Sequence, residues 1–215
     1  MPGLLKNNLS RKNFSLLPTP LYQLNQLSND LDSHLYCLRD DLTGFAFGGN
    51  KTRKLDFLLA DALQQGAEAI IAVGAVQSNF CRMASGAARA CGLEVYLVLG
   101  GEQPAKATGN LLIDQLFGAK ITYVDSQDWG EWEKQAHRLE ANLREEGRAV
   151  YRMPVGGSTP IGCCGYITAF EQILDWSSSH GVDFDYIFHA TSSGGTQAGL
   201  VIGAAASGLR GKIVE

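Results

Sequence analysis

Two lysines stand three residues apart directly after a pair of glycines, in residues 48–54 (GGNKTRK). Glycines allow a tight turn and a close approach of the backbone to a ligand. Leucines at helical spacing follow from Leu55, so Lys51 is expected at a helix start and Lys54 one turn on, roughly on the same side. Because the helix dipole disfavours cations there, the pair indicates an anion or a reactive amine. The alternative is the basic, solvated first turn of an ordinary helix.

A second loop, residues 74–79 (GAVQSN), lies between an apolar run and a helix of small residues. It offers a hydroxyl, two amides and the free N–H groups of a helix start, which suit an anion or a polar ring substituent. The alternative is that Ser78 or Asn79 is only the N-cap of that helix.

A third loop, residues 191–196 (TSSGGT), follows an apolar strand and precedes a helix. Hydroxyls and glycines before a helix N-terminus are typical of a phosphate cradle. The chain has neither the GxxxxGK[ST] pattern of a Walker loop nor a GxGxxG after its first strand, so neither a Walker site nor a nicotinamide cofactor is favoured. The alternative is a flexible Ser/Gly turn.

The three loops together require a ligand with a phosphate, an amine-reactive carbonyl and a polar ring. Lysine forms Schiff bases with such a carbonyl. Pyridoxal phosphate has all three features, so it is the cofactor that these loops predict.

The elements that would position these loops alternate along the chain. Short apolar strands without polar alternation, separated by helices, are typical of βαβ units on a parallel sheet covered on both faces. The loops then lie at strand ends, where such sheets bind ligands. The expected strands are residues 35–38, 69–73, 95–99, 120–124, 149–153, 185–189 and one starting at 212, and the expected helices are residues 55–65, 80–90, 110–117, 129–146, 166–178 and 197–206.

Composition narrows the function classes. The chain has 215 residues, 45% hydrophobic and 19% charged, which is typical of a globular protein. Its net charge of -4 argues against nucleic acid or an anionic membrane as main partner. No apolar run is long enough to span a bilayer and no signal-peptide core is present, so a cytoplasmic location is expected. The five cysteines and four histidines have neither disulfide nor metal-site spacing, so no metal is expected.

Three motifs stand in the order and spacing of one family: residues 48–55 (GGNKTRKL), 77–79 (QSN) and 193–199 (SGGTQAG). Residues 17–21 (LPTPL) and 39–44 (RDDLTG) are similar to family segments too. The chain resembles the 1-aminocyclopropane-1-carboxylate deaminase / D-cysteine desulfhydrase family of pyridoxal-phosphate enzymes over nearly its whole length. The resemblance implies an α/β fold with the two-domain, parallel-sheet, three-layer architecture of the tryptophan-synthase-β-like enzymes.

The resemblance also implies roles for single residues. Lys51 would carry the cofactor as a Schiff base and move a proton at or near the α-carbon, while Asn79 would hydrogen-bond the ring hydroxyl oxygen. Ser78, the second implied catalytic residue, would receive the substrate carboxylate with the backbone N–H groups of residues 79 and 80. Phe80 stands beside the expected substrate, where family members commonly carry His or Gln. The implied cofactor-binding set is Asn50, Lys51, Lys54, Asn79, Ser193, Gly194, Gly195 and Thr196, in which Lys54 and residues 193–196 hold the phosphate.

The same resemblance implies a domain order and an activity. Residues 1–52 would begin a large cofactor domain, residues 53–160 would form a small α/β domain, and residues 161–215 would return to the large domain. Family chains run on past Glu215, so an incomplete large domain is expected here. The residues that separate ring-opening from thiol elimination belong to that further part.

The expected function is a pyridoxal-phosphate-dependent lyase or deaminase acting on a small amino acid. D-cysteine desulfhydrase is the leading expectation, with 1-aminocyclopropane-1-carboxylate deaminase beside it, and a homodimer is the family's usual assembly. Two alternatives stay open: a serine/threonine dehydratase or cysteine synthase-like enzyme of the wider fold type, or a domain that binds the cofactor without turnover.

Overall fold

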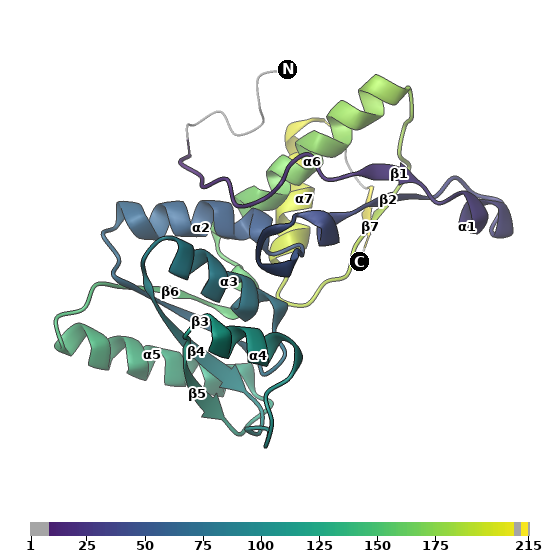
Figure 1. Ribbon diagram of the computed structural model, residues 1–215. Coiled ribbons are helices and arrows are strands. Elements are labelled where there is room, and N and C mark those ends of the chain that lie inside the picture. The colour runs from purple at the N-terminus through teal and green to yellow at the C-terminus, as the bar shows by residue number, and fades with distance from the viewer. Residues whose placement is uncertain (1–8, 209–211, 215) are drawn as a thin grey trace.

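The computed structural model describes residues 9–208 and 212–214. Its largest sheet has four parallel strands in the order β5-β4-β3-β6 (Figure 1). Ile70 of the central strand pairs with Val95 on one side and with Tyr151 on the other. The strands are β3 (Ala69–Ala75), β4 (Glu94–Gly100), β5 (Lys120–Val124) and β6 (Val150–Met153).

Helices cover both faces of this sheet, which explains the uninterrupted apolar runs of its strands. Ile70 and Ala72 face α2 (Thr52–Gln64), α3 (Asn79–Ala90) and α4 (Gly109–Leu116). Ile71 and Val73 point the opposite way, against Trp132 of α5 (Trp129–Glu145). The result is a three-layer arrangement with a core on each side of the sheet.

Of two further helices, one packs against α2 and the other packs against the first. The contact between α6 (Pro160–His180) and α7 (Gly195–Ala206) is close, because a Cβ on Gly199 would lie 2.4 Å from the carbonyl oxygen of Cys163. The short parallel pair β7 (Ile187–Phe188) and β8 (Ile213–Val214) adjoins α7.

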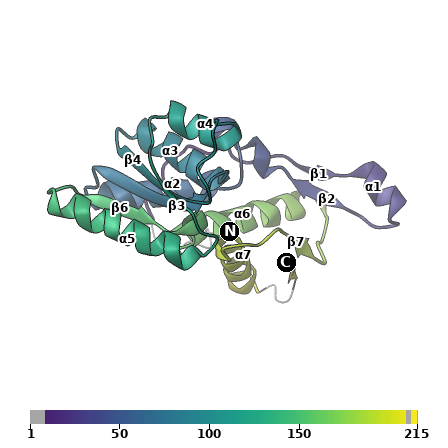
Figure 2. The same cartoon turned by 90° about the horizontal axis from the view of Figure 1, so that it is seen from below.

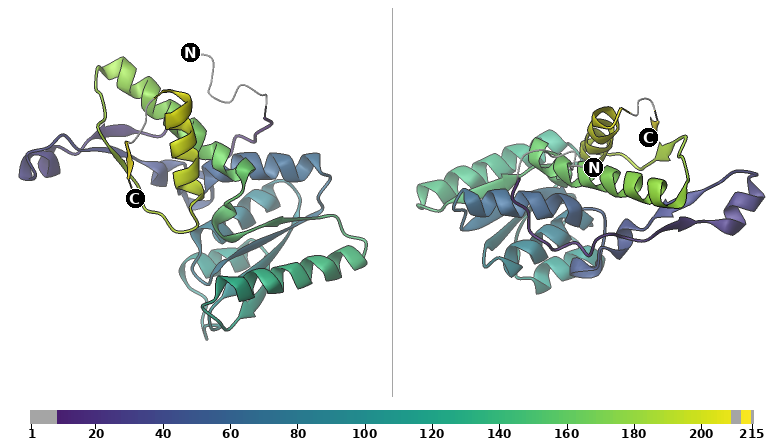
Figure 3. Two further views of the ribbon diagram at one scale, coloured as in Figure 1. Left: turned by 180° about the vertical axis from the view of Figure 1, so that it is seen from behind. Right: turned by 90° about the horizontal axis from the view of Figure 1, so that it is seen from above.

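The N-terminal part forms an arm that projects away from the layered body (Figures 2 and 3). It consists of β1 (Leu21–Gln23), α1 (Asn25–Asp30) and β2 (Tyr36–Leu38), with β1 antiparallel to β2. Three short 3₁₀ turns, η1 (Asp40–Leu42), η2 (Phe45–Phe47) and η3 (Val155–Gly157), complete the described elements.

The predicted strands and helices of the main sheet are confirmed to within a few residues. The predicted start of α6 was wrong by six residues, because Thr159 caps the helix by accepting a hydrogen bond from Gly162 N, with Pro160 at the first position. The sequence pattern also missed β1 and α1, which are short. Across residues 9–208 and 212–214, none of the helices has both the length and the apolar character that crossing a membrane requires. The division at residues 52/53 and 160/161 stays a prediction.

Candidate active site

The three loops singled out by the sequence meet around one cavity of about 200 Å³. One loop supplies Asn50 and Lys51, the second supplies Asn79, and residues 190–196, hereafter the serine loop, line the rest. The second loop follows β3 and the serine loop follows β7, so the cavity lies at strand ends as expected for parallel α/β sheets.

Residues 48–54, hereafter the lysine turn, are held in a backbone conformation that favours glycine. Gly48 has φ 72° and Gly49 has φ 131°. The Gly48 carbonyl accepts a hydrogen bond from Arg82 Nη2 at 2.8 Å. Thr43 Oγ1 both accepts from Gly49 N and donates to Gly49 O, each at 2.9 Å. The turn therefore has its shape before any ligand binds.

Lys51 is the N-cap residue of α2, which confirms its predicted place at a helix start. Burial lowers the pKa of its amine. Within the described part of the chain, the Lys51 amine makes no hydrogen bond or ion pair, although it borders the cavity. Such an amine is poised to be the free nucleophile that Schiff-base formation requires.

Asn79 reaches the lysine turn directly. Its Nδ2 donates to Asn50 Oδ1 at 3.0 Å, and both residues line the cavity. One amide edge of Asn79 is thus used to hold Asn50, and the rest of its amide stays available to a ligand in the cavity.

Ser78 and Gln77 mainly shape the second loop. Ser78 caps α3, since its Oγ accepts from Cys81 N at 3.2 Å, and it does not line the cavity. Gln77 holds the start of α4: its Nε2 donates to Thr108 O and its Oε1 accepts from Asn110 N. Ser78 is thus the N-cap of α3, and its expected contact with a substrate carboxylate stays a prediction.

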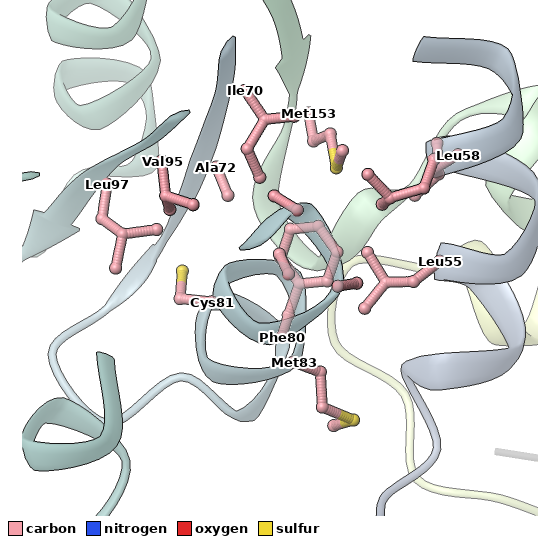
Figure 4. Close-up of a cluster of buried hydrophobic side chains, with 14 of the residues drawn as sticks. Leu55, Leu58, Ile70, Ala72, Phe80, Cys81, Met83, Val95, Leu97 and Met153 are labelled. Atoms are coloured by element: carbon pink, nitrogen blue, oxygen red, sulfur yellow. The ribbon is translucent and has the colours of Figure 1, made fainter. Parts of the chain in front are cut away.

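The side chain of Phe80 is buried in the core. Its side chain is 1% exposed and packs in the core between α3 and α2, beside Leu55 and Leu58 (Figure 4). The first turn of α3 directs this side chain under the helix into the apolar layer, and the substrate contact expected of Phe80 stays a prediction. Its backbone N–H still lies in that first turn.

An anion cradle forms where Lys54, the serine loop and η3 meet. Lys54 is 1% exposed, and its Nζ donates to Gly156 O at 3.1 Å and to Ser158 Oγ at 3.4 Å. Ser158 Oγ lies 2.7 Å from Ser193 Oγ. A Cβ on Gly195 would stand 2.5 Å from Ser158 Oγ and 2.6 Å from Lys54 Nζ, so only glycine leaves the cradle open.

The electrostatics of the cradle favour a bound anion. Burial and the positive charge of Lys51 lower the pKa of Lys54 to about 8. Gly194 and Gly195 begin α7, whose first-turn N–H groups lack partners within the helix and point outward at its positive end. A phosphate placed here would gain these donors and would neutralise the two neighbouring amines.

Ser158 and Gly156 were not among the residues that the sequence predicted for the site. Both follow β6, which pairs with β3 at the edge of the sheet, so their loop lies at the same sheet edge as residues 74–79. The position of β6 beside β3 is the signal that could have identified these two residues. It depends on the order of the strands in the sheet, which local sequence patterns do not give. Thr43 and Arg82, which hold the lysine turn through hydrogen bonds, were not predicted from the sequence either.

Pyridoxal phosphate fits this donor set. The cradle matches its phosphate, Lys51 matches its aldehyde, and the Asn79 amide matches its ring hydroxyl oxygen. Across residues 9–208 and 212–214, no group of three or more His, Cys, Asp or Glu side chains is arranged to hold a metal.

The fold and the site define a class of protein: an α/β protein with parallel sheets whose cavity joins a buried amine to an anion cradle. Residues 13–214 match the family described as "Pyridoxal-phosphate dependent enzyme", and the chain belongs to that family.

Similar proteins refine this class. A Pyrococcus furiosus protein, named provisionally as a 1-aminocyclopropane-1-carboxylate deaminase, is 42% identical over 87% of this chain and 56% of its own length. The Arabidopsis thaliana "Bifunctional D-cysteine desulfhydrase/1-aminocyclopropane-1-carboxylate deaminase, mitochondrial" is 36% identical over 93% of this chain and 53% of its own. The Serratia proteamaculans "D-cysteine desulfhydrase" is 37% identical over 86% and 57%.

Among solved structures, an "ACC deaminase homologue" superimposes with a TM-score of 0.89 at 40% identity, over 95% of this chain and 61% of its own. The chain thus spans little more than half the length of the relatives it matches. The expected α/β fold of the tryptophan-synthase-β-like enzymes and the expected family are both confirmed.

Proposed function

We propose that this chain binds pyridoxal 5′-phosphate through Lys51 and acts on a small amino acid as a lyase or deaminase. The substrate is D-cysteine or 1-aminocyclopropane-1-carboxylate, the compounds named in its relatives. The observation that supports this best is the convergence of Lys51, Asn79 and the anion cradle on one cavity.

Each residue has a task that follows from its contacts. Lys51 presents a desolvated amine whose pKa is lowered by burial, so its Nζ would hold the cofactor at the aldehyde and would take up and return a proton at the substrate α-carbon or a neighbouring carbon. Lys54, Ser158, residues 193–196 and the start of α7 hold the phosphate. Asn50 and Asn79 orient the ring.

Ser78 receives the substrate carboxylate in this proposal. Its Oγ accepts from Cys81 N and its hydroxyl also bonds to the Cys81 side chain, so a carboxylate oxygen would take the hydroxyl proton in place of that sulfur. The N–H groups of residues 79 and 80 belong to the first turn of α3 and add to this donor set. Phe80 contributes through its backbone only.

The bound cofactor supplies an electron sink for the substrate α-carbon. With D-cysteine and one water molecule, the products are pyruvate, sulfide and ammonia. With 1-aminocyclopropane-1-carboxylate and one water molecule, they are a four-carbon 2-oxo acid and ammonia. The proposal also includes the domain boundaries expected from the resemblance, a homodimer and a cytoplasmic location.

The test is to load the protein with pyridoxal 5′-phosphate, reduce it with borohydride and map the labelled peptide. We expect the label on Lys51, its loss in Lys51→Ala and its retention in Lys120→Ala, a change at an exposed lysine. A label on another lysine, or none, would contradict the proposal. Assays for sulfide and for the two 2-oxo acids then separate the substrates, while labelling of Lys51 without any product would leave a cofactor-binding domain.

A further inference from the structure

A buried polar network lies beneath the lysine turn, outside the cavity lining. Its centre is Arg53, which is 1% exposed. The Arg53 Nε and Nη2 atoms donate to the two carboxylate oxygens of Asp40, at 2.9 Å and 2.7 Å. Nη2 also donates to Thr19 Oγ1 and to Gln172 Oε1, both at 2.8 Å. Asp40 is therefore held in one orientation by a buried charge.

Tyr166 connects this network to the lysine turn. Its hydroxyl lies 3.0 Å from Asp40 Oδ2 and 3.2 Å from the Asn50 carbonyl oxygen, and its single proton is shared between these two acceptors in a three-centre hydrogen bond. Asn50 is the residue directly before Lys51. Burial, and then the neighbouring Asp40 carboxylate, hold the pKa of Tyr166 well above its usual range, so the hydroxyl keeps the proton that it donates.

The backbone packing around Tyr166 leaves little freedom. A Cβ on Gly165 would stand 2.3 Å from Arg53 O, so α6 touches the backbone of α2 at this point. A Cβ on Gly199 would stand 2.5 Å from Tyr166 Cβ, so α7 touches α6 at Tyr166. The Tyr166 side chain thus lies where the helix that starts at Lys51 and the helix that starts at the anion cradle both meet α6.

We propose that Tyr166, held in place by Asp40 and Arg53, is a positioning residue that fixes the Asn50–Lys51 peptide so that the Lys51 amine faces the cavity. Asn50 is then held at both ends, its side chain by Asn79 and its carbonyl by Tyr166. The cofactor-dependent part of this inference rests on the function proposed above.

The test compares the hydroxyl of Tyr166, which bonds to the residue before Lys51, with the hydroxyl of Tyr151, which bonds to α2 farther along the chain. Tyr166→Phe removes the donor to Asn50 O and Asp40 while keeping the ring. Tyr151→Phe is the matched control: its hydroxyl donates to Asp61 Oδ2 at 2.6 Å, ten residues beyond Lys51 on α2, roughly 15 Å along the helix. Each change removes one partly or fully buried hydroxyl, so both lower the thermal unfolding midpoint.

Cofactor affinity is the first measurement. We expect Tyr166→Phe to weaken the binding of pyridoxal 5′-phosphate five- to tenfold, with fewer molecules trapped on Lys51 by borohydride. We expect Tyr151→Phe to stay within twofold of the unchanged protein. Equal weakening in both variants, or no weakening in Tyr166→Phe, would overturn the proposal.

Hydrogen exchange gives a second measurement that needs no cofactor. The amides of residues 49–55 should exchange at least threefold faster in Tyr166→Phe and at an unchanged rate in Tyr151→Phe. If the unchanged protein fails to bind the cofactor but this difference is seen, the proposed function fails and the positioning role stands. Unchanged exchange in Tyr166→Phe would refute the positioning role even where the cofactor binds to Lys51.

Discussion

The lysine turn and the serine loop line the same cavity, but the protein holds them very differently. Gly48, Gly49 and Asn50 each have a backbone or side-chain bond to Arg82, Thr43, Tyr166 or Asn79. Within residues 9–208 and 212–214, one side-chain bond ties the serine loop to another element, that between Ser193 and Ser158. Thr191 and Ser192 are exposed.

This difference matches the two tasks. A nucleophilic amine must face its target in one orientation, so the turn that carries it is built from the protein's own bonds. A phosphate brings several acceptors of its own and can complete the bonds of the loop that receives it. The lysine turn is therefore preformed, while the serine loop and α7 N-terminus present donors that a bound anion would satisfy. Glycine substitutions in each region test this contrast.

The largest effect is expected from Gly48→Ala in the lysine turn. A Cβ there would stand 2.0 Å from the backbone oxygen of Asp41, at φ 72°. We expect a loss of about 3 kcal/mol in the free energy of unfolding, or roughly 6–12 °C in the thermal midpoint. The control is Gly118→Ala, with φ 74° and open space around its Cβ, which carries only the cost of the backbone strain. Similar losses in both variants would show that the turn is no more tightly held than a surface bend.

The next effect is expected from Gly195→Ala in the cradle. Its Cβ would meet side-chain atoms, Ser158 Oγ and Lys54 Nζ, which can move apart at small cost to folding. We expect sulfate binding, measured by calorimetry, to weaken about thirtyfold (~2 kcal/mol), with the unfolding midpoint nearly unchanged. Gly203→Ala, on the same helix but against Phe170, should do the reverse and lower stability while sparing sulfate affinity. Retained sulfate binding in Gly195→Ala would contradict the assigned cradle.

The charge of Lys54 provides a pH test of the same cradle. Its folded-state pKa is lowered to about 8, below the usual lysine value, so the free protein loses this positive charge as pH rises through 8. Sulfate keeps its charge over that range and binds best to the protonated amine, so its affinity should fall about tenfold between pH 7 and pH 9. In Lys54→Met the affinity should be lower at pH 7 and independent of pH. A pH dependence that survives in Lys54→Met would assign the titration to Lys51 instead.

The contrast also explains what the sequence could predict. Asn79 and residues 193–196 were predictable because each of their loops stands between an apolar strand and a helix, and Lys51 was predictable because a glycine pair and a basic first turn precede an amphipathic helix. The same periodicity predicted β3 to β6 and most of the helices. These are local signals, and they identify residues that line the cavity.

The residues that hold the site could not be predicted in this way. Arg82 and Gly48 are 34 residues apart, and Tyr166 and Asn50 are 116 apart, so no local spacing announces either bond. The burial of the Phe80 side chain could not be predicted for a related reason. Its direction depends on how the first turn of α3 meets α2, which the neighbouring motif does not encode.

The smallest effect is expected from Ser158→Ala. Its hydroxyl bridges Lys54 and Ser193, so its loss removes one donor from the cradle and the one side-chain tether of the serine loop described above. We expect sulfate binding to weaken about fivefold (~1 kcal/mol). Ser207→Ala is the matched control, because its hydroxyl donates to Ala204 O near the opposite end of α7.

If the serine loop is held mainly by the anion, hydrogen exchange of residues 190–196 in Ser158→Ala should rise without sulfate and return to the unchanged rate in saturating sulfate. Exchange that stays fast in saturating sulfate would mean that the Ser158 tether, and not the anion, orders the loop.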